Sequence, residues 1–163
     1  MKLLCITLLI FVCFSCKGQV NNQNSTEQNS ETMTTEKFDI ETFEKNKIDG
    51  EYNFVLDDGT EIMQEIDNEF YNETIKPPLP ETFITDKRYY SSGNLESELV
   101  HFPNRFLKSL KKYDETGKLI EEINYDKPFK FSFEQLIELI RNEKDTIDLF
   151  DKNTTIGRGS DES

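Results

Sequence analysis

The chain has 163 residues, a formal net charge of -13 and 35% hydrophobic residues. This length suits one domain with additional segments, and the strongly acidic balance argues against nucleic acid as a partner. Cys5, Cys13 and Cys16 are its only cysteines. A domain formed by the later residues therefore has no disulfide and no thiolate metal ligand, and we expect neither a metal nor another cofactor.

The N-terminus has the pattern of a signal peptide. Lys2 precedes an apolar run over residues 3–14, which has the length of a signal-peptide core and is shorter than the ~20 residues of a bilayer span. The run ends at Ser15-Cys16. This ending resembles the lipobox of Bacteroidetes-type bacterial lipoproteins. An ordinary cleaved signal peptide or a buried apolar strand is the alternative interpretation.

The lipoprotein resemblance implies that residues 1–15 are removed and that Cys16 carries the lipid. It also implies a location in the cell envelope, at the outer membrane facing the periplasm, with the bilayer as the first partner. Two acyl chains suffice for a stable anchor. Residues 16–37 then form the lipidated cysteine and a linker, which we predict to be disordered because it is polar and nearly free of apolar groups.

We predict an α+β domain over residues 38–151, followed by a flexible tail over 152–163. A short helix is expected from about Phe38 to Lys45 with Asp39 as its cap, and Asp57-Asp58-Gly59 is typical of a hairpin turn. Proline-rich residues 76–80 indicate a connector. A second helix over 133–142 begins with a capping box, and residues 147–150 are predicted to form a last short strand or turn.

An internal repeat lies between these elements. Residues 87–99 and 111–123 share the frame K-[KR]-Y-x-x-x-G-x-L-x-x-E-[LI], with a period of 24 residues. Each copy predicts a strand, a glycine turn and a returning strand. We therefore expect a twisted antiparallel β-meander over about 83–125, with Leu95 and Leu99 on one face of the sheet and the C-terminal helix packed on it.

The repeat resembles the MORN-variant hairpins of the YwqK-like antitoxin family, over residues 87–126. The matching positions are Tyr89, Gly93, Leu95 and Glu98 in the first copy, and Tyr113, Gly117, Leu119 and Glu122 in the second. Residues 113–119 are also similar to a YD repeat of the large toxin-shell proteins. These likenesses imply a scaffold that presents a surface, and they carry no catalytic residue.

Candidate chemistry is sparse. His101 is the single histidine and is expected to be structural, because a histidine base needs an orienting partner and a substrate. Neighbouring acids such as Asp57 and Asp58, or Glu121 and Glu122, are numerous enough to arise on solvated strand faces. Asp145-Thr146-Ile147 resembles a Bacteroidetes O-glycosylation pattern, with Thr146 as the acceptor.

A basic band offers a candidate partner-binding surface within the acidic chain. Its members are Arg105, Lys108, Lys111 and Lys112, with Lys87 and Arg88 nearby. The alternative is cross-strand pairing with glutamates on neighbouring strands.

The sequence thus predicts a membrane-anchored envelope lipoprotein without catalytic residues, which binds a protein partner through its sheet. An immunity or antitoxin-like role is the specific form suggested by the repeats. The alternative is a carboxylate-dependent hydrolase acting on envelope glycan, which requires two acids converging in a cleft.

Overall fold

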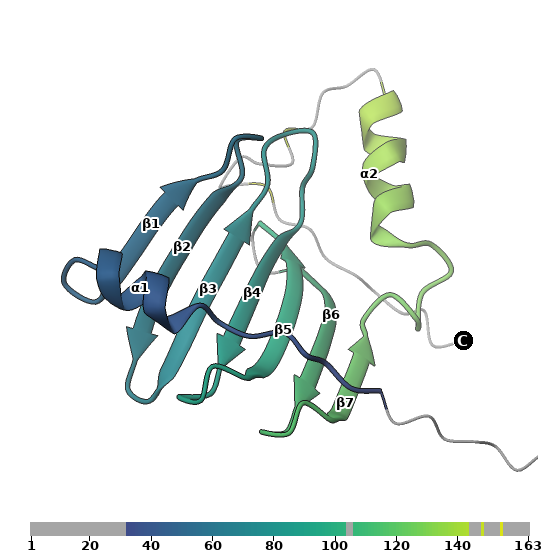
Figure 1. Cartoon of the computed structure of the whole chain (residues 1–163). Helices are drawn as coiled ribbons and strands as arrows, with labels where there is room; N and C mark the ends of the chain where they lie inside the picture. Colours follow the sequence, from purple (N-terminus) through teal and green to yellow (C-terminus); the bar gives the residue numbers. More distant parts are fainter. Residues whose placement is uncertain (1–31, 104–105, 144–147, 149–153, 155–163) are drawn as a thin grey trace, which may run out of the picture. The chain divides into compact units, whose positions relative to one another are not determined.

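A computed structural model describes residues 32–103, 106–143, 148 and 154. Within them a seven-stranded antiparallel sheet has its strands in sequence order, β1 to β7, with a helix at either end of the described chain (Figure 1). The elements are α1 (Ile40–Asn46), β1 (Glu51–Val55), β2 (Glu61–Asp67), β3 (Phe70–Lys76), β4 (Ile84–Tyr89), β5 (Leu95–Phe102), β6 (Phe106–Tyr113), β7 (Leu119–Asn124) and α2 (Phe133–Asn142). The predicted α+β class and the antiparallel meander are confirmed.

The predicted caps of both helices are confirmed. The carboxylate of Asp39 caps α1 by accepting from the amide of Thr42 at 3.0 Å, and Ser132 and Gln135 form the expected reciprocal capping box of α2. Strand β3 was not predicted, because its sequence FYNETIK places polar residues at both parities.

Three hairpin turns share one geometry, although the sequence repeat marks only two of them. In each turn a glycine with positive φ, Gly59, Gly93 or Gly117, donates its amide to the carbonyl three residues earlier. The residue that begins the turn also donates its own amide to the carbonyl four residues later, for example the amide of Leu56 to the carbonyl of Thr60 at 2.9 Å. The hairpin β1–β2 is therefore a structural third copy of the turn.

Residues 32–38 form an extended segment, here called the strap, that crosses the turns of the two repeat hairpins (Figure 1). The amide of Thr34 donates to the carbonyl of Gly117 at 2.8 Å, and the amide of Phe38 donates to the carbonyl of Gly93 at 2.9 Å. The predicted linker boundary at residue 37 is thus too late, because residues 32–37 already belong to the fold. Their polar composition concealed main-chain pairing, which does not depend on side chains.

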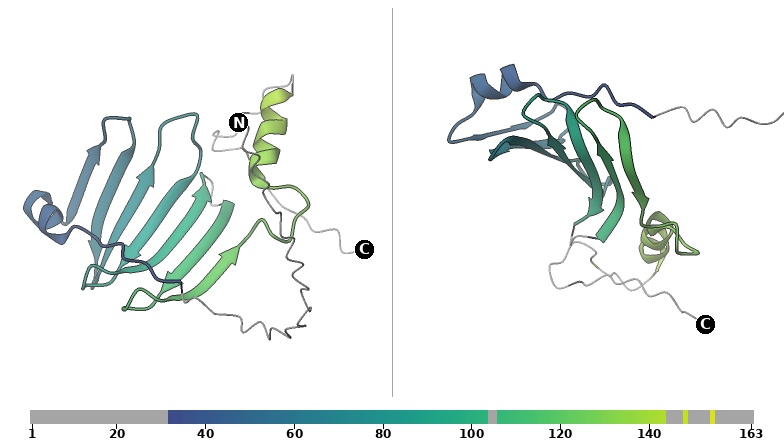
Figure 2. Two further views of the ribbon diagram at one scale, coloured as in Figure 1. Left: turned by 45° about the vertical axis from the view of Figure 1, so that its right-hand side comes forward. Right: turned by 90° about the horizontal axis from the view of Figure 1, so that it is seen from below.

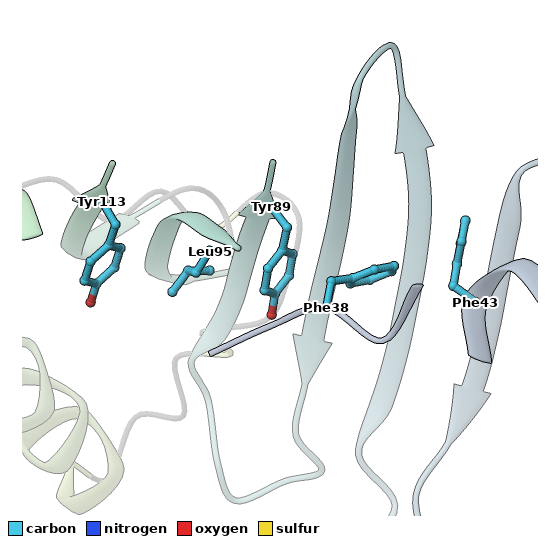
Figure 3. Packing of buried hydrophobic residues seen from close by; sticks show 5 residues of the cluster. All are labelled: Phe38, Phe43, Tyr89, Leu95 and Tyr113. Carbon is cyan, nitrogen blue, oxygen red and sulfur yellow. The ribbon is translucent and has the colours of Figure 1, made fainter. Parts of the chain in front are cut away.

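The strap and α1 cover a core built from the repeat tyrosines and leucines (Figure 3). Phe38 stacks on Tyr71 with 4.7 Å between ring centroids and also contacts Tyr89. Phe43 from α1 is fully buried beside it. Each of these rings buries a large apolar area, so this cluster holds the strap, the helix and the repeats together.

A second core forms at the opposite ends of the strands, where α2 packs on the same face of the sheet (Figure 2). Phe133 of α2 stacks on Phe106 with centroids 4.2 Å apart and meets Phe102 edge-on at 5.0 Å. The face that carries both cores is called the strap face below, and the other is called the opposite face.

The register of the strands corrects one prediction about these faces. Tyr89 pairs with Leu95, but Arg88 pairs with Ser97, so the chain bulges by one residue. The second repeat bulges at the same place, between Lys112 and Tyr113. Because one extra residue inverts the alternation of side chains, Leu95 lies on the strap face and Leu99 on the opposite face. The two leucines were predicted to share one face.

We expect Gly117→Ala to destabilise the fold more than Gly59→Ala. Both glycines have φ near +90°, which costs an L-residue about 1–2 kcal/mol. A Cβ at residue 117 would also lie 2.4 Å from the carbonyl oxygen of Thr34, whereas one at residue 59 would meet Pro78 at 3.6 Å. Urea unfolding of both variants measures the difference. Equal losses of stability would contradict the described strap contact.

Candidate binding face

The opposite face carries an aliphatic stripe that no described segment covers. Leu99, Leu110 and Ile123 are direct cross-strand neighbours on β5, β6 and β7. Ile84 and Leu107 flank them through their pairing with His101. All five side chains are half-buried. We call these five residues the aliphatic stripe.

The same cross-strand row becomes polar towards β1. Continuing from Leu99, its members are Asp86, Thr74, Met63 and Asn53. The stripe is therefore confined to the half of the sheet built from the repeats, because both copies place an aliphatic residue, Leu99 or Ile123, after the bulge.

His101 borders the stripe in a short hydrogen-bonded chain. Its Nε2 lies 2.9 Å from an oxygen of Asp86, and its Nδ1 lies 3.0 Å from the carbonyl of Phe102. The hydroxyl of Thr74 donates to the other oxygen of Asp86 at 2.7 Å. Both ring nitrogens thus face acceptors, an arrangement that the doubly protonated imidazolium satisfies.

The electrostatics of the pair follow from this geometry. The hydrogen bond to Asp86 raises the pKa of His101 above its usual value, against the opposing effect of burial. The bond to His101 in turn lowers the pKa of Asp86. Asp86 orients the histidine, and the hydroxyl that adjoins the pair, that of Thr74, is bonded to Asp86 and not to either ring nitrogen.

The predicted basic band does not form one surface. Lys108 turns to Glu134 of α2 and lies over the ring of Phe83. Lys111 lies on the strap face opposite Glu122, while Lys112 lies on the opposite face with Glu121 at 2.7 Å. Arg105 is outside the described residues. Lys111 and Lys112 thus show the cross-strand pairing that was the alternative to a partner site, whereas Lys108 pairs with a glutamate of the helix α2.

Acids that are adjacent in sequence are separated in the structure. Glu121 and Glu122 occupy opposite faces because side chains alternate along β7. Asp58 accepts from the amide of Thr60 at 2.9 Å in its turn, and this bond lowers its pKa. The acid pair that does face one solvent region is Glu51 and Glu65, which lie directly opposite each other on β1 and β2.

A polar group that the sequence analysis missed lies under the strap. The hydroxyl of Tyr89 is 2.9 Å from a carboxylate oxygen of Glu36 and 3.2 Å from one of Glu73. Lys87 also reaches Glu36 at 2.5 Å, and Gln64 reaches Glu73 at 2.6 Å. Burial, with these two carboxylates, raises the pKa of Tyr89 strongly. No local signal could have found this network, because Glu36 and Tyr89 are 53 residues apart.

Comparison with known proteins adds no relative. No family model, no curated protein and no solved structure matches the chain. Cys16 and Thr146, the predicted sites of lipid and sugar, lie outside the described residues, as do residues 147, 149 and 150 of the expected last strand or turn and the tail except Thr154. Within the described part, no helix is both long and apolar enough to cross a bilayer.

The fold should lose stability as the pH rises through the raised pKa of His101. The ion pair with Asp86 contributes fully below the unfolded histidine pKa of about 6.5. It also requires an ionised Asp86, which the lowered pKa of that carboxyl favours. Because Asp86 is 43% exposed, we expect a loss of at most about 1 kcal/mol.

Urea unfolding at a series of pH values from about 5.5 to 8.5 measures this loss. The variant His101→Gln removes the single histidine of the chain and should flatten the profile. A wild-type profile as flat as that of the variant would refute the pairing.

Proposed function

We propose that this protein is a non-catalytic envelope lipoprotein, anchored through Cys16, that binds a protein partner through the aliphatic stripe of its opposite face. The observation that supports this most is the unequal treatment of the two faces. The strap, α1 and α2 bury the strap face, while neither buried cluster of the described residues includes a side chain of the opposite face.

An aliphatic surface on one side of a sheet needs a covering layer. Sheets in globular domains bury their apolar faces against another element, and a contiguous exposed apolar patch typically marks an interaction site. Ile84, Leu99 and Leu110 with their neighbours form a contiguous apolar patch of half-buried side chains, bordered by the charges of Asp86, His101 and Lys112. An apolar centre with a polar rim is the usual anatomy of a protein interface.

The hydrolase alternative receives less support. The facing acids Glu51 and Glu65 border a groove of about 240 Å³, below the 300–1,000 Å³ that small-ligand sites usually occupy. A groove of about 500 Å³ beside α2 is lined by Glu81, Glu134 and Glu138, but Glu134 is already paired with Lys108. The antitoxin-like form of the proposal still depends on the repeat resemblance alone.

The anchor and the strap are compatible in this proposal. The strap begins at residue 32, beside the turn of Gly117, so the segment from Cys16 would join the domain at the ends of the repeat hairpins. These turns lie at the ends of the strands and not on a face of the sheet. An anchor that joins the domain there would therefore leave the aliphatic stripe accessible.

A photo-crosslinking residue at position 123 should capture a specific protein in living cells. The same residue at position 122 is the matched control, since Glu122 is the sequence neighbour but lies on the strap face. Mass spectrometry of the captured band identifies the partner. Equal capture from both positions, or none from position 123, would reject the stripe as the binding site.

The variant Cys16→Ala should remain unprocessed and lose its lipid. The thiol is the only group at that position that can carry a diacyl chain, and a single remaining apolar run of signal-peptide length gives no stable span. Metabolic labelling with a radioactive fatty acid, together with the intact mass, tests both effects. Unchanged processing or labelling would remove the anchor from the proposal.

A further inference from the structure

We propose a second binding site at the free edge of β1, which pairs with an extended, basic segment of a partner protein. This proposal goes beyond the aliphatic stripe and needs neither that stripe nor the lipid. β1 and the stripe are at different ends of the strand order, since the stripe occupies β4 to β7.

The hydrogen-bonding pattern of β1 identifies the free groups. The amide of Leu56 donates to the carbonyl of Thr60, and the amide of Ile66 donates to the carbonyl of Gly50. Because hydrogen-bonded pairs alternate along an antiparallel ladder, the amides and carbonyls of Asn53 and Val55 point away from the sheet. By the same alternation, the main-chain groups of Tyr52 and Phe54, the even-numbered residues of β1, form the hydrogen bonds with β2.

The free stretch of β1 is limited at its N-terminal end by Glu51. The main chain of Glu51 also points outward, but it exchanges two bonds with Ile48 at 2.8 and 3.0 Å. The available edge is therefore short and consists of the four main-chain groups of Asn53 and Val55. An extended segment that pairs there adds one strand to the sheet, a common mode of peptide recognition.

The side chains of this edge are not those of a protected edge strand. Edge strands usually carry lysine, proline or a bulge that prevents pairing, and β1, with the sequence EYNFV, has none of these. Val55 is 65% exposed and Leu56 is 45% exposed. On the strap face, Tyr52 and Phe54 stack with centroids 4.7 Å apart and present half-buried rings to an incoming apolar side chain.

Charge selects a basic occupant. Glu51 and Glu65 lie directly opposite each other on the opposite face, an arrangement that costs free energy between like charges. No described cation pairs with either of them. They line a groove with Asn53, Met63, Asn72 and Thr74, next to the place where alternate side chains of an added strand would lie.

The same charges disfavour a second copy of this chain. Antiparallel pairing of Asn53 with Val55 of another copy would place Glu51 opposite Asp57, so that acids would face acids at both ends. A segment with alternating lysine and apolar residues avoids this repulsion. Its lysines would compensate Glu51 and Glu65, while its apolar side chains would cover Tyr52 and Phe54.

The test uses the full chain and a capped hexapeptide of alternating lysine and valine, with the glutamate–valine peptide as the control ligand. Hydrogen–deuterium exchange should show that the lysine peptide slows exchange of residues 51–55 and that the glutamate peptide does not. Absence of binding up to about 1 mM, protection elsewhere only, or equal effects of both peptides would overturn the proposal.

Two variants separate strand pairing from general attraction to an acidic protein. Val55→Pro removes an outward amide that the ladder with β2 does not use, and should weaken binding about 5-fold. The double variant Glu51→Gln, Glu65→Gln should weaken it about 3- to 10-fold. The matched control, Glu122→Gln with Glu138→Gln, removes the same charge elsewhere and should leave the affinity unchanged.

Faster hydrogen–deuterium exchange of the amides of β2 and β3 would show that Val55→Pro disturbs the fold. In that case the two charge variants decide the test. Equal weakening by both charge variants would overturn the proposal by showing non-specific attraction. Self-association through β1, detected by sedimentation, would also overturn it.

Discussion

The pairing of the strap with the two repeat turns is the interaction on which the rest of the structure depends. A sheet of seven strands joined in sequence order has two faces to cover, and the described chain offers little beyond two short helices and the strap. By crossing Gly117 and Gly93, the strap brings Phe38 and then α1 over the repeat tyrosines. One face thereby becomes a core, and the other is left to carry the aliphatic stripe.

The repeat frame shows how much of this could be predicted and where prediction stops. Strands, turns and the helix caps follow from local chemistry, so the meander and α2 were predictable. The bulge before each tyrosine was not, because a one-residue insertion into a ladder leaves no local pattern. It decides which face receives Leu99 and Ile123. The sequence therefore predicts the strands that carry the aliphatic stripe, but it places Leu99 on the wrong face of the sheet.

The closed polar network at the strap shows why converging acids here do not indicate catalysis. Glu36 and Glu73 converge on one tyrosine hydroxyl, which resembles an acid pair in a site. Each carboxylate, however, is also held by a donor from a strand, Lys87 or Gln64. Half-buried groups that satisfy one another in this way are already engaged in hydrogen bonds. The network instead ties the strap to β3 and β4, far from the polar groups that face solvent.

The distribution of cations explains why the charge of the protein is unbalanced at one edge. Every lysine in the described strands lies beside a carboxylate, including Lys76 with Glu61 and Lys87 with Glu36. The repeat copies supply most of these lysines, and they supply the opposing glutamates as well. β1 and β2 contain acids but no cation, so Glu51 and Glu65 face each other without a compensating cation from the part of the chain that the structure describes. The β1–β2 hairpin lacks the lysines of the repeat frame. It is thus also the hairpin whose free edge we propose as the site for a basic strand of a partner.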